Sequence, residues 1–95
     1  MTTSIADTDI PSIVPPFRLQ WEEAQGCYVL LYPEGMVRLN LPAGEILSRC
    51  DGERTIADIV TELEDAFPDA ADLRADVIQF LDTAHEQQWI DRRPA

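Results

Sequence analysis

Residues 28–40 read YVLLYPEGMVRLN and carry the clearest sheet signal in the chain. Two short runs of β-branched, aromatic and aliphatic residues flank Pro33-Glu34-Gly35, whose residue types are those of turns. This pattern predicts a β-hairpin whose second strand covers residues 36–40. Because helical patterns follow it, that strand is expected to be the last of the sheet and to lie at its edge. An unpaired edge exposes backbone N–H and C=O groups, so it is either a liability or a binding site.

Before the hairpin, apolar residues alternate with polar ones at Phe17, Leu19 and Trp21, which predicts a half-buried strand. After it, the chain predicts three helices. Asn40 is the expected N-cap of the first, over residues 41–50. Thr55-x-x-Asp58 matches a capping box that opens the second, and the third is expected over about residues 72–88. The predicted fold class is therefore α+β, a three-stranded antiparallel sheet followed by three helices, with a winged-helix-like order.

A chain of 95 residues predicts one small domain. Residues 1–16 contain three prolines among Thr, Ser and Asp, and they predict a flexible N-terminal tail. The folded domain is expected over residues 17–91, with a frayed C-terminus over residues 92–95. The sequence leaves the oligomeric state open, and strand exchange in a homodimer is one arrangement it allows.

The chain is strongly acidic, with 18 Asp plus Glu against 7 Lys plus Arg and a net charge of −11. A field of this sign repels phosphate backbones and anionic lipid, so no nucleic acid and no membrane is expected as a partner. No apolar run approaches the length of a membrane span, and the N-terminus lacks the basic start of a signal peptide. Cys27 and Cys50 form no C-x-x-C pattern, which argues against a disulfide framework or a zinc site. No metal and no cofactor is expected. A cytoplasmic location is expected.

Catalytic chemistry has little support in the residues. His85 is the single histidine, and no nucleophile motif accompanies it. A small catalytic subunit that uses His85 or Cys27 remains one alternative. A winged-helix DNA-binding regulator is another, but its recognition helix should be rich in basic and amide side chains. The third helix offers Arg74 among several acids instead. A non-catalytic binding module is therefore the preferred interpretation.

The expected working surface is the edge strand, to which an extended peptide adds as a further strand. Its predicted peptide-binding residues are Met36, Val37, Arg38, Leu39 and Asn40. A stripe on the third helix is the predicted wall of the groove, and it consists of Arg74, Val77, Ile78, Leu81 and His85. An alternative remains open, in which this stripe and a core stripe through Leu73, Phe80 and Ala84 form one wide buried face.

Three stretches resemble one known family: WEEAQGCYVLLYPEGMVRLN (21–40), ILSRCDGERTIADIV (46–60), and the FL and WI pairs of residues 80–81 and 89–90. They are similar to the PqqD family, the pyrroloquinoline quinone (PQQ) biosynthesis proteins D, over about residues 17–91. The resemblance implies a peptide chaperone without catalytic activity. Such proteins bind the precursor peptide PqqA and present it to PqqE, a radical S-adenosylmethionine (SAM) enzyme. The peptide is then expected to add beside the third strand, against the third helix.

Overall fold

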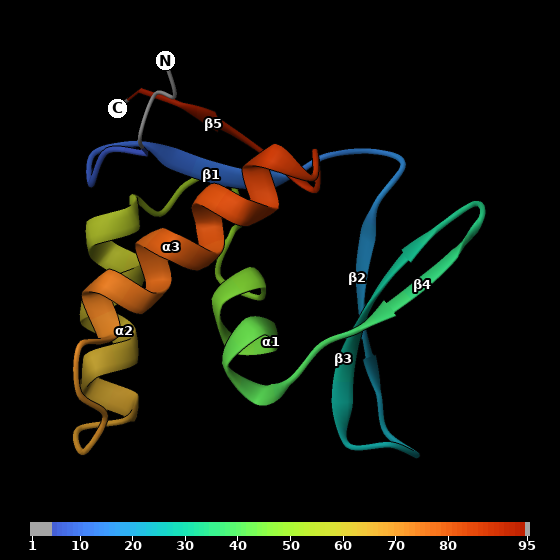
Figure 1. Ribbon diagram of the computed structural model, residues 1–95, viewed down its shortest axis with the longest axis horizontal. Helices are drawn as coiled ribbons and strands as arrows, with labels where there is room; N and C mark the ends of the chain where they lie inside the picture. The colour runs from blue at the N-terminus through green and yellow to red at the C-terminus, as the bar shows by residue number, and fades with distance from the viewer. Residues whose placement is uncertain (1–4, 95) are drawn as a thin grey trace.

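The computed structural model describes residues 5–94 and places them in five strands and three helices (Figure 1). In chain order these are β1 (Ile10–Ile13), β2 (Arg18–Glu22), β3 (Cys27–Tyr32), β4 (Gly35–Arg38), α1 (Leu41–Leu47), α2 (Ile56–Ala66), α3 (Leu73–Glu86) and β5 (Ile90–Arg93). The predicted α+β class is confirmed, since β2, β3 and β4 form one antiparallel sheet and the three helices follow it.

The three-stranded sheet has the order β2-β3-β4, so the apolar strand β3 is its centre. Val29 and Leu30, neighbours on β3, are both fully buried although their side chains point to opposite faces. The β2–β3 turn contains Gly26 with φ +66°, a left-handed conformation that favours glycine. The sheet therefore forms from two consecutive hairpins, as the residue pattern predicts.

Two segments that are far apart in the sequence pair with each other in a second, two-stranded sheet, β1 with β5. Ile10 lies opposite Arg93, and Asp9 accepts a hydrogen bond from Arg92 Nη1 at 2.6 Å. Ile10 and Pro11 are buried, as is Ile5. The predicted flexible tail is therefore wrong for residues 10–13, and the predicted fraying is wrong for residues 92 and 93. Residues 1–4 and 95 of those two predictions lie outside the described residues.

The helix starts follow their capping residues. Asn40 Oδ1 accepts a hydrogen bond from the N–H of Ala43 at 2.9 Å and caps α1. Thr55 and Asp58 form the predicted capping box of α2. Asp72 stands at the N-cap position of α3 with φ +56°, but its side chain makes no capping bond. No helix within residues 5–94 combines the length and hydropathy that crossing a membrane requires.

One hydrophobic core joins the sheet to the helices. Its buried members come from every layer, and they include Leu30, Leu39, Ile46, Leu47, Ile56, Ile59, Leu63, Val77, Leu81 and Ile90. Helix α1 lies close to β3, where a Cβ built on Gly44 would stand 2.8 Å from Cδ2 of Tyr28. A glycine at this position lets the helix approach the sheet at that distance.

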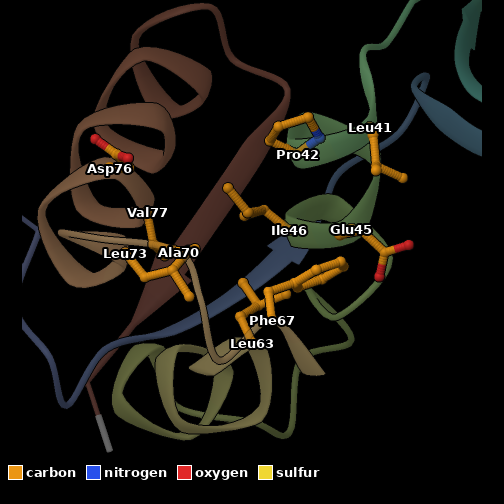
Figure 2. A pocket seen from close by; sticks show the side chains of 10 residues that line it. All are labelled: Leu41, Pro42, Glu45, Ile46, Leu63, Phe67, Ala70, Leu73, Asp76 and Val77. Atoms are coloured by element: carbon orange, nitrogen blue, oxygen red, sulfur yellow. The ribbon is translucent and has the colours of Figure 1, made fainter. Parts of the chain in front are cut away.

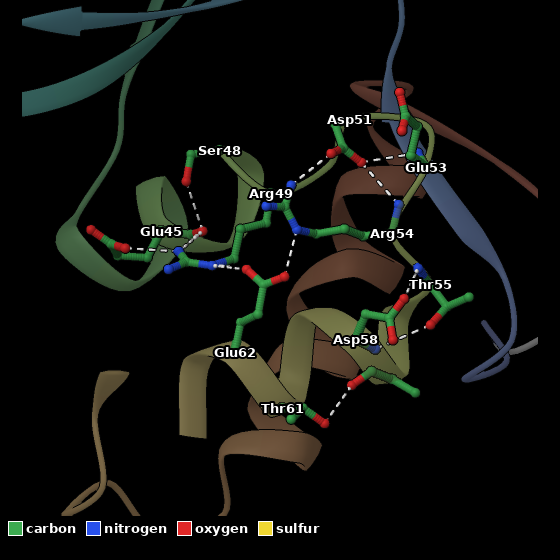
Figure 3. Close-up of polar contacts among 11 residues, drawn as sticks. Glu45, Ser48, Arg49, Asp51, Glu53, Arg54, Thr55, Asp58, Thr61 and Glu62 are labelled. Atoms are coloured by element: carbon green, nitrogen blue, oxygen red, sulfur yellow. Dashed lines mark hydrogen bonds and ion pairs between the residues drawn. The ribbon is translucent and has the colours of Figure 1, made fainter. Parts of the chain in front are cut away.

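A chain of ion pairs ties the helical segments together on the surface (Figure 3). Glu62 of α2 binds Arg49, which follows α1, at 3.2 Å, and it binds Arg54 at 2.6 Å. Arg54 also pairs with Asp51 at 2.6 Å, and Arg49 with Glu45 at 2.8 Å. Such a network holds the α1–α2 connection in place more effectively than isolated surface pairs would.

Candidate peptide-binding site

Strand β4 is an edge strand, since β3 is its one partner within residues 5–94. The N–H of Leu39, just after β4, donates to the carbonyl of Tyr28 at 3.1 Å. In an antiparallel ladder, residues that exchange hydrogen bonds with the partner strand alternate with residues that do not. Val37, which lies opposite Leu30, is two positions from Leu39 and has the same phase. Its backbone N–H and C=O therefore point at β3.

The intervening residues have the opposite phase, so the N–H and C=O of Met36 and Arg38 point away from β3 at the free edge. Asn40 shares this phase but is engaged elsewhere. Its carbonyl accepts a hydrogen bond from the N–H of Gly44 at 3.0 Å, and its side chain caps α1 through Ala43. Of the five strand residues predicted for the site, Met36 and Arg38 are thus the two whose N–H and C=O both face outward without a partner among the described residues.

The side chains of the edge divide between two faces. Leu39 is buried and Val37 is half-buried against the core, so both belong to the core-facing side. Met36 and Arg38 are exposed on the opposite face. Arg18 lies on that face too, because Arg18 and Met36 are both paired with Leu31 of β3. Arg18 and Arg38 form no ion pair among the described residues. This outer face therefore carries two arginines on an acidic protein, together with Glu22, which has the same phase as Arg18 on β2.

The predicted wall on α3 is only partly available. Val77 and Leu81 have exposed fractions of 0%, and with Ala84 they form the stripe by which α3 packs on the core. Ile78 is half-buried and also packs against the core. The structure thus agrees with the alternative of one wide buried face at these positions. Both side chains are buried in this conformation, although Val77 also lines a hollow between α1 and α3, so their place in a peptide groove stays a prediction.

The two polar members of the predicted wall lie apart from β4. Arg74 is exposed and forms an ion pair with Asp7. His85 is half-buried and lines a shallow, open hollow beside Ile90 of β5 and Val14 of the β1–β2 connection. The sequence could not place His85 there, because β1 and β5 were not predicted as strands.

The buried thiol has no nucleophilic character. Burial, reinforced by the neighbouring Asp51 carboxylate, raises the pKa of Cys50 to about 12. Its Sγ lies 3.4 Å from the carbonyl oxygen of Ile46, to which the neutral thiol donates. Because the thiolate is the reactive form, Cys50 is inert at neutral pH. Within residues 5–94, no group of three or more His, Cys, Asp or Glu side chains is arranged to hold a metal ion.

Comparison with known proteins places this fold and edge in a family. A family model described as Coenzyme PQQ synthesis protein D (PqqD) matches residues 27–90. The chain belongs to the PqqD family. A relative from Azotobacter vinelandii, named PqqA binding protein, is 52% identical over 83 residues, 87% of this chain and 90% of the relative. A Pseudomonas aeruginosa PAO1 protein of the same name is 50% identical over 82 residues, 86% and 89% of the two chains.

A solved structure supports the same assignment. The solution NMR structure of the PqqD truncation of Methylobacterium extorquens PqqCD matches with a TM-score of 0.77 and 26% identity. The match covers 95% of this chain and 97% of that one. That protein is described as a functional and stand-alone recognition element for ribosomally synthesized and post-translationally modified peptides. The PqqD match runs from the start of β3 to the first residue of β5 and so contains the whole candidate edge.

Proposed function

We propose that this PqqD-family chain is a non-catalytic peptide carrier in PQQ biosynthesis. It binds the precursor peptide PqqA by strand addition to β4 and presents it to the radical SAM enzyme PqqE. The observation that carries the proposal is the pair of residues Met36 and Arg38, whose backbone groups face outward at the sheet edge. The names of the relatives, PqqA binding protein, supply the ligand.

The geometry of the edge defines what the peptide must do. An added strand accepts hydrogen bonds from the N–H groups of Met36 and Arg38 and donates to their carbonyls. The outward-facing backbone groups of Met36 and Arg38 lie roughly 7 Å apart, which is the length of two residues of strand. Backbone pairing gives affinity for any extended segment, whereas side chains that alternate between the two faces give selectivity. Next to Val37 the peptide meets apolar surface, and next to Arg38 it meets a positive charge.

Carrying the peptide has a thermodynamic benefit for the enzyme that modifies it. A disordered peptide loses conformational entropy when an active site orders it. A carrier that holds the peptide and also contacts the enzyme replaces a bimolecular encounter by a local one, which raises the effective concentration of the peptide. The covalent chemistry belongs to PqqE, and this chain contributes binding and positioning.

The charge of α3 opposes the DNA-binding alternative. Its exposed positions include Asp76 and Glu86, and its one arginine, Arg74, is neutralised by Asp7. A recognition helix needs side chains that donate to base edges and phosphates, and this helix instead presents carboxylates that repel phosphate.

Amide hydrogen exchange tests the proposal residue by residue. In the free protein the amides of Met36 and Arg38 should exchange rapidly, because they face solvent, while those of Val37 and Leu39 should be protected. Addition of PqqA should protect Met36 and Arg38 selectively. If PqqA binds but these two amides continue to exchange at the free rate, strand addition to β4 is the wrong mode. If PqqA does not bind, the proposed function itself fails.

A further inference from the structure

A second surface of the protein is unaccounted for by peptide addition. A hollow of about 230 Å³ lies where α1, the end of α2 and the start of α3 meet (Figure 2). Its walls are mainly apolar and include Leu41, Ile46, Leu63 and Phe67. The volume exceeds that of a single large aliphatic side chain, so the hollow has room to accept one from another molecule.

The rim of this hollow exposes apolar side chains. Leu41 has an exposed fraction of 65% and Phe67 of 36%, although both are large and apolar. Leu41 also lines a smaller neighbouring hollow together with Trp21, which is 49% exposed. Three of the four exposed large apolar residues in the described part of the chain therefore lie on one band, which runs from Trp21 through Leu41 to Phe67. Such grouping marks interaction surfaces.

The chain segment that forms the α2 and α3 side of the hollow is acidic. Residues 62–76 contain six acids and one base, Arg74, which is paired with Asp7. Five of these acids are exposed and form no ion pair among the described residues: Glu64, Asp65, Asp69, Asp72 and Asp76. Asp76 of α3 is itself one of the residues that line the hollow. Complementary charge for such a rim is supplied by Lys or Arg.

Helix α1 separates the hollow from the sheet. Its Gly44 side lies against Tyr28 of β3, while Ile46 and Leu41 line the hollow. In Figure 2 the hollow opens between α1 and α3, with the strands of the sheet beyond α1. A ligand in the hollow and a peptide on β4 therefore occupy different sides of α1.

We propose that this hollow is the docking site for a basic segment of a second protein. That segment inserts one apolar side chain between Leu41 and Phe67 and places a neighbouring Lys or Arg against Asp76. The chemistry of the segment follows from the hollow, whereas the identity of the second protein rests on the proposed function, in which the enzyme PqqE receives the peptide. The carrier then has one surface for the peptide and another for the enzyme.

The test measures PqqE and PqqA binding separately by calorimetry on the full chain. Leu41→Gln removes an exposed apolar rim residue, and Asp76→Lys reverses the charge in the wall. Each should weaken PqqE binding about tenfold or more and leave PqqA affinity within about twofold. Glu86→Lys is the matched control, because it makes the same charge change at the far end of α3 and should leave both affinities unchanged. Thermal unfolding of each variant confirms that it is folded.

Several outcomes overturn the docking proposal. They are failure of PqqE to bind the wild-type chain, wild-type PqqE affinity in both variants, and loss of PqqA binding in Leu41→Gln. The last result would assign the hollow to the peptide. Self-association that Leu41→Gln abolishes would assign it to a second copy of the chain. If PqqA fails to bind while PqqE binding still depends on Leu41 and Asp76, the proposed function falls and the docking surface stands.

Discussion

Proline substitution at two adjacent positions of β4 should have opposite consequences. The N–H of Val37 points at β3, whereas the N–H of Arg38 points at the free edge. Proline lacks this donor and places its ring where the hydrogen was. Val37→Pro should therefore damage the sheet, while Arg38→Pro should leave it folded and block the strand that adds to it. Edge strands accept proline when the missing N–H faces solvent.

The magnitudes follow from what each N–H contacts. Val37→Pro leaves the carbonyl of the fully buried Leu30 without its donor, and the lost bond and the misplaced ring together cost roughly 3 kcal/mol. For a domain of this size that lowers the Tm by roughly 12–24 °C. Arg38→Pro costs the fold less than about 1 kcal/mol, since its N–H faces the free edge and makes no bond to β3. It should weaken PqqA binding at least about tenfold, through one lost hydrogen bond and the steric block.

Thermal unfolding and calorimetric titration with PqqA separate the two effects. Arg38→Ala is the control for Arg38→Pro, because it removes the same side chain and keeps the N–H. It should retain most of the affinity that Arg38→Pro loses. Equal destabilisation by the two prolines would show that the assigned ladder phase is wrong. A folded Arg38→Pro variant with wild-type affinity would exclude strand addition at this edge.

Three other substitutions probe the packing, the termini and the outer face. Gly44→Ala should lower the Tm, because a Cβ 2.8 Å from Tyr28 Cδ2 costs about 1–3 kcal/mol, more than the roughly 1 kcal/mol of helix propensity it gains; an unchanged or higher Tm would contradict this close packing. Burial raises the pKa of Asp9, but hydrogen bonds from a backbone N–H and from Arg92 outweigh it and lower that pKa overall. The stabilisation by Asp9 is therefore present above its unfolded pKa of about 3.9 and is lost as the pH falls through the lower folded value. Asp9→Asn should be less stable than wild type in urea at pH 7, with the difference shrinking towards pH 2; a difference independent of pH would refute the linkage. Wild-type protein should bind a PqqA variant with Glu opposite Arg38 about two- to fivefold more tightly than a variant with Lys there, and Arg38→Glu should reverse this preference by a similar factor. Equal affinities for the two peptide variants would show that this peptide position does not face residue 38.

The parts of the fold that depend on residues close in sequence could be predicted from the sequence. The hairpin at residues 28–40 is defined by its turn residues, and Asn40 and Thr55 cap helices through bonds to residues three positions away. These interactions are local, so residue type and spacing suffice to predict them. The edge position of β4 followed in turn, because no strand pattern comes directly after it.

The parts of the fold that depend on residues distant in sequence could not be predicted. The strand β1 contains Pro11 and has no alternating pattern, and its partner β5 is remote, as the 83 positions between Asp9 and Arg92 indicate. Nothing local distinguishes such a segment from a tail. The role of α3 residues was also ambiguous, since Val77 and Leu81 satisfy both a groove and a core by spacing alone. Their burial depends on how α3 docks on the other helices, which is a property of the packed molecule.

The pairing of β1 with β5 makes the beginning and the end of the fold neighbours on one ribbon. Because these strands are antiparallel, residue 10 enters the ribbon beside residue 93, where the chain leaves it. In Figure 1 this ribbon lies at the opposite side of the molecule from the tip of the β3–β4 hairpin. A short linker could therefore join the two ends, and the chain could be reopened at the exposed turn around Gly26, where a Cβ added to the glycine would meet no other atom within 4 Å. The same geometry allows the domain to be inserted whole into a loop of another protein while the edge of β4 stays accessible.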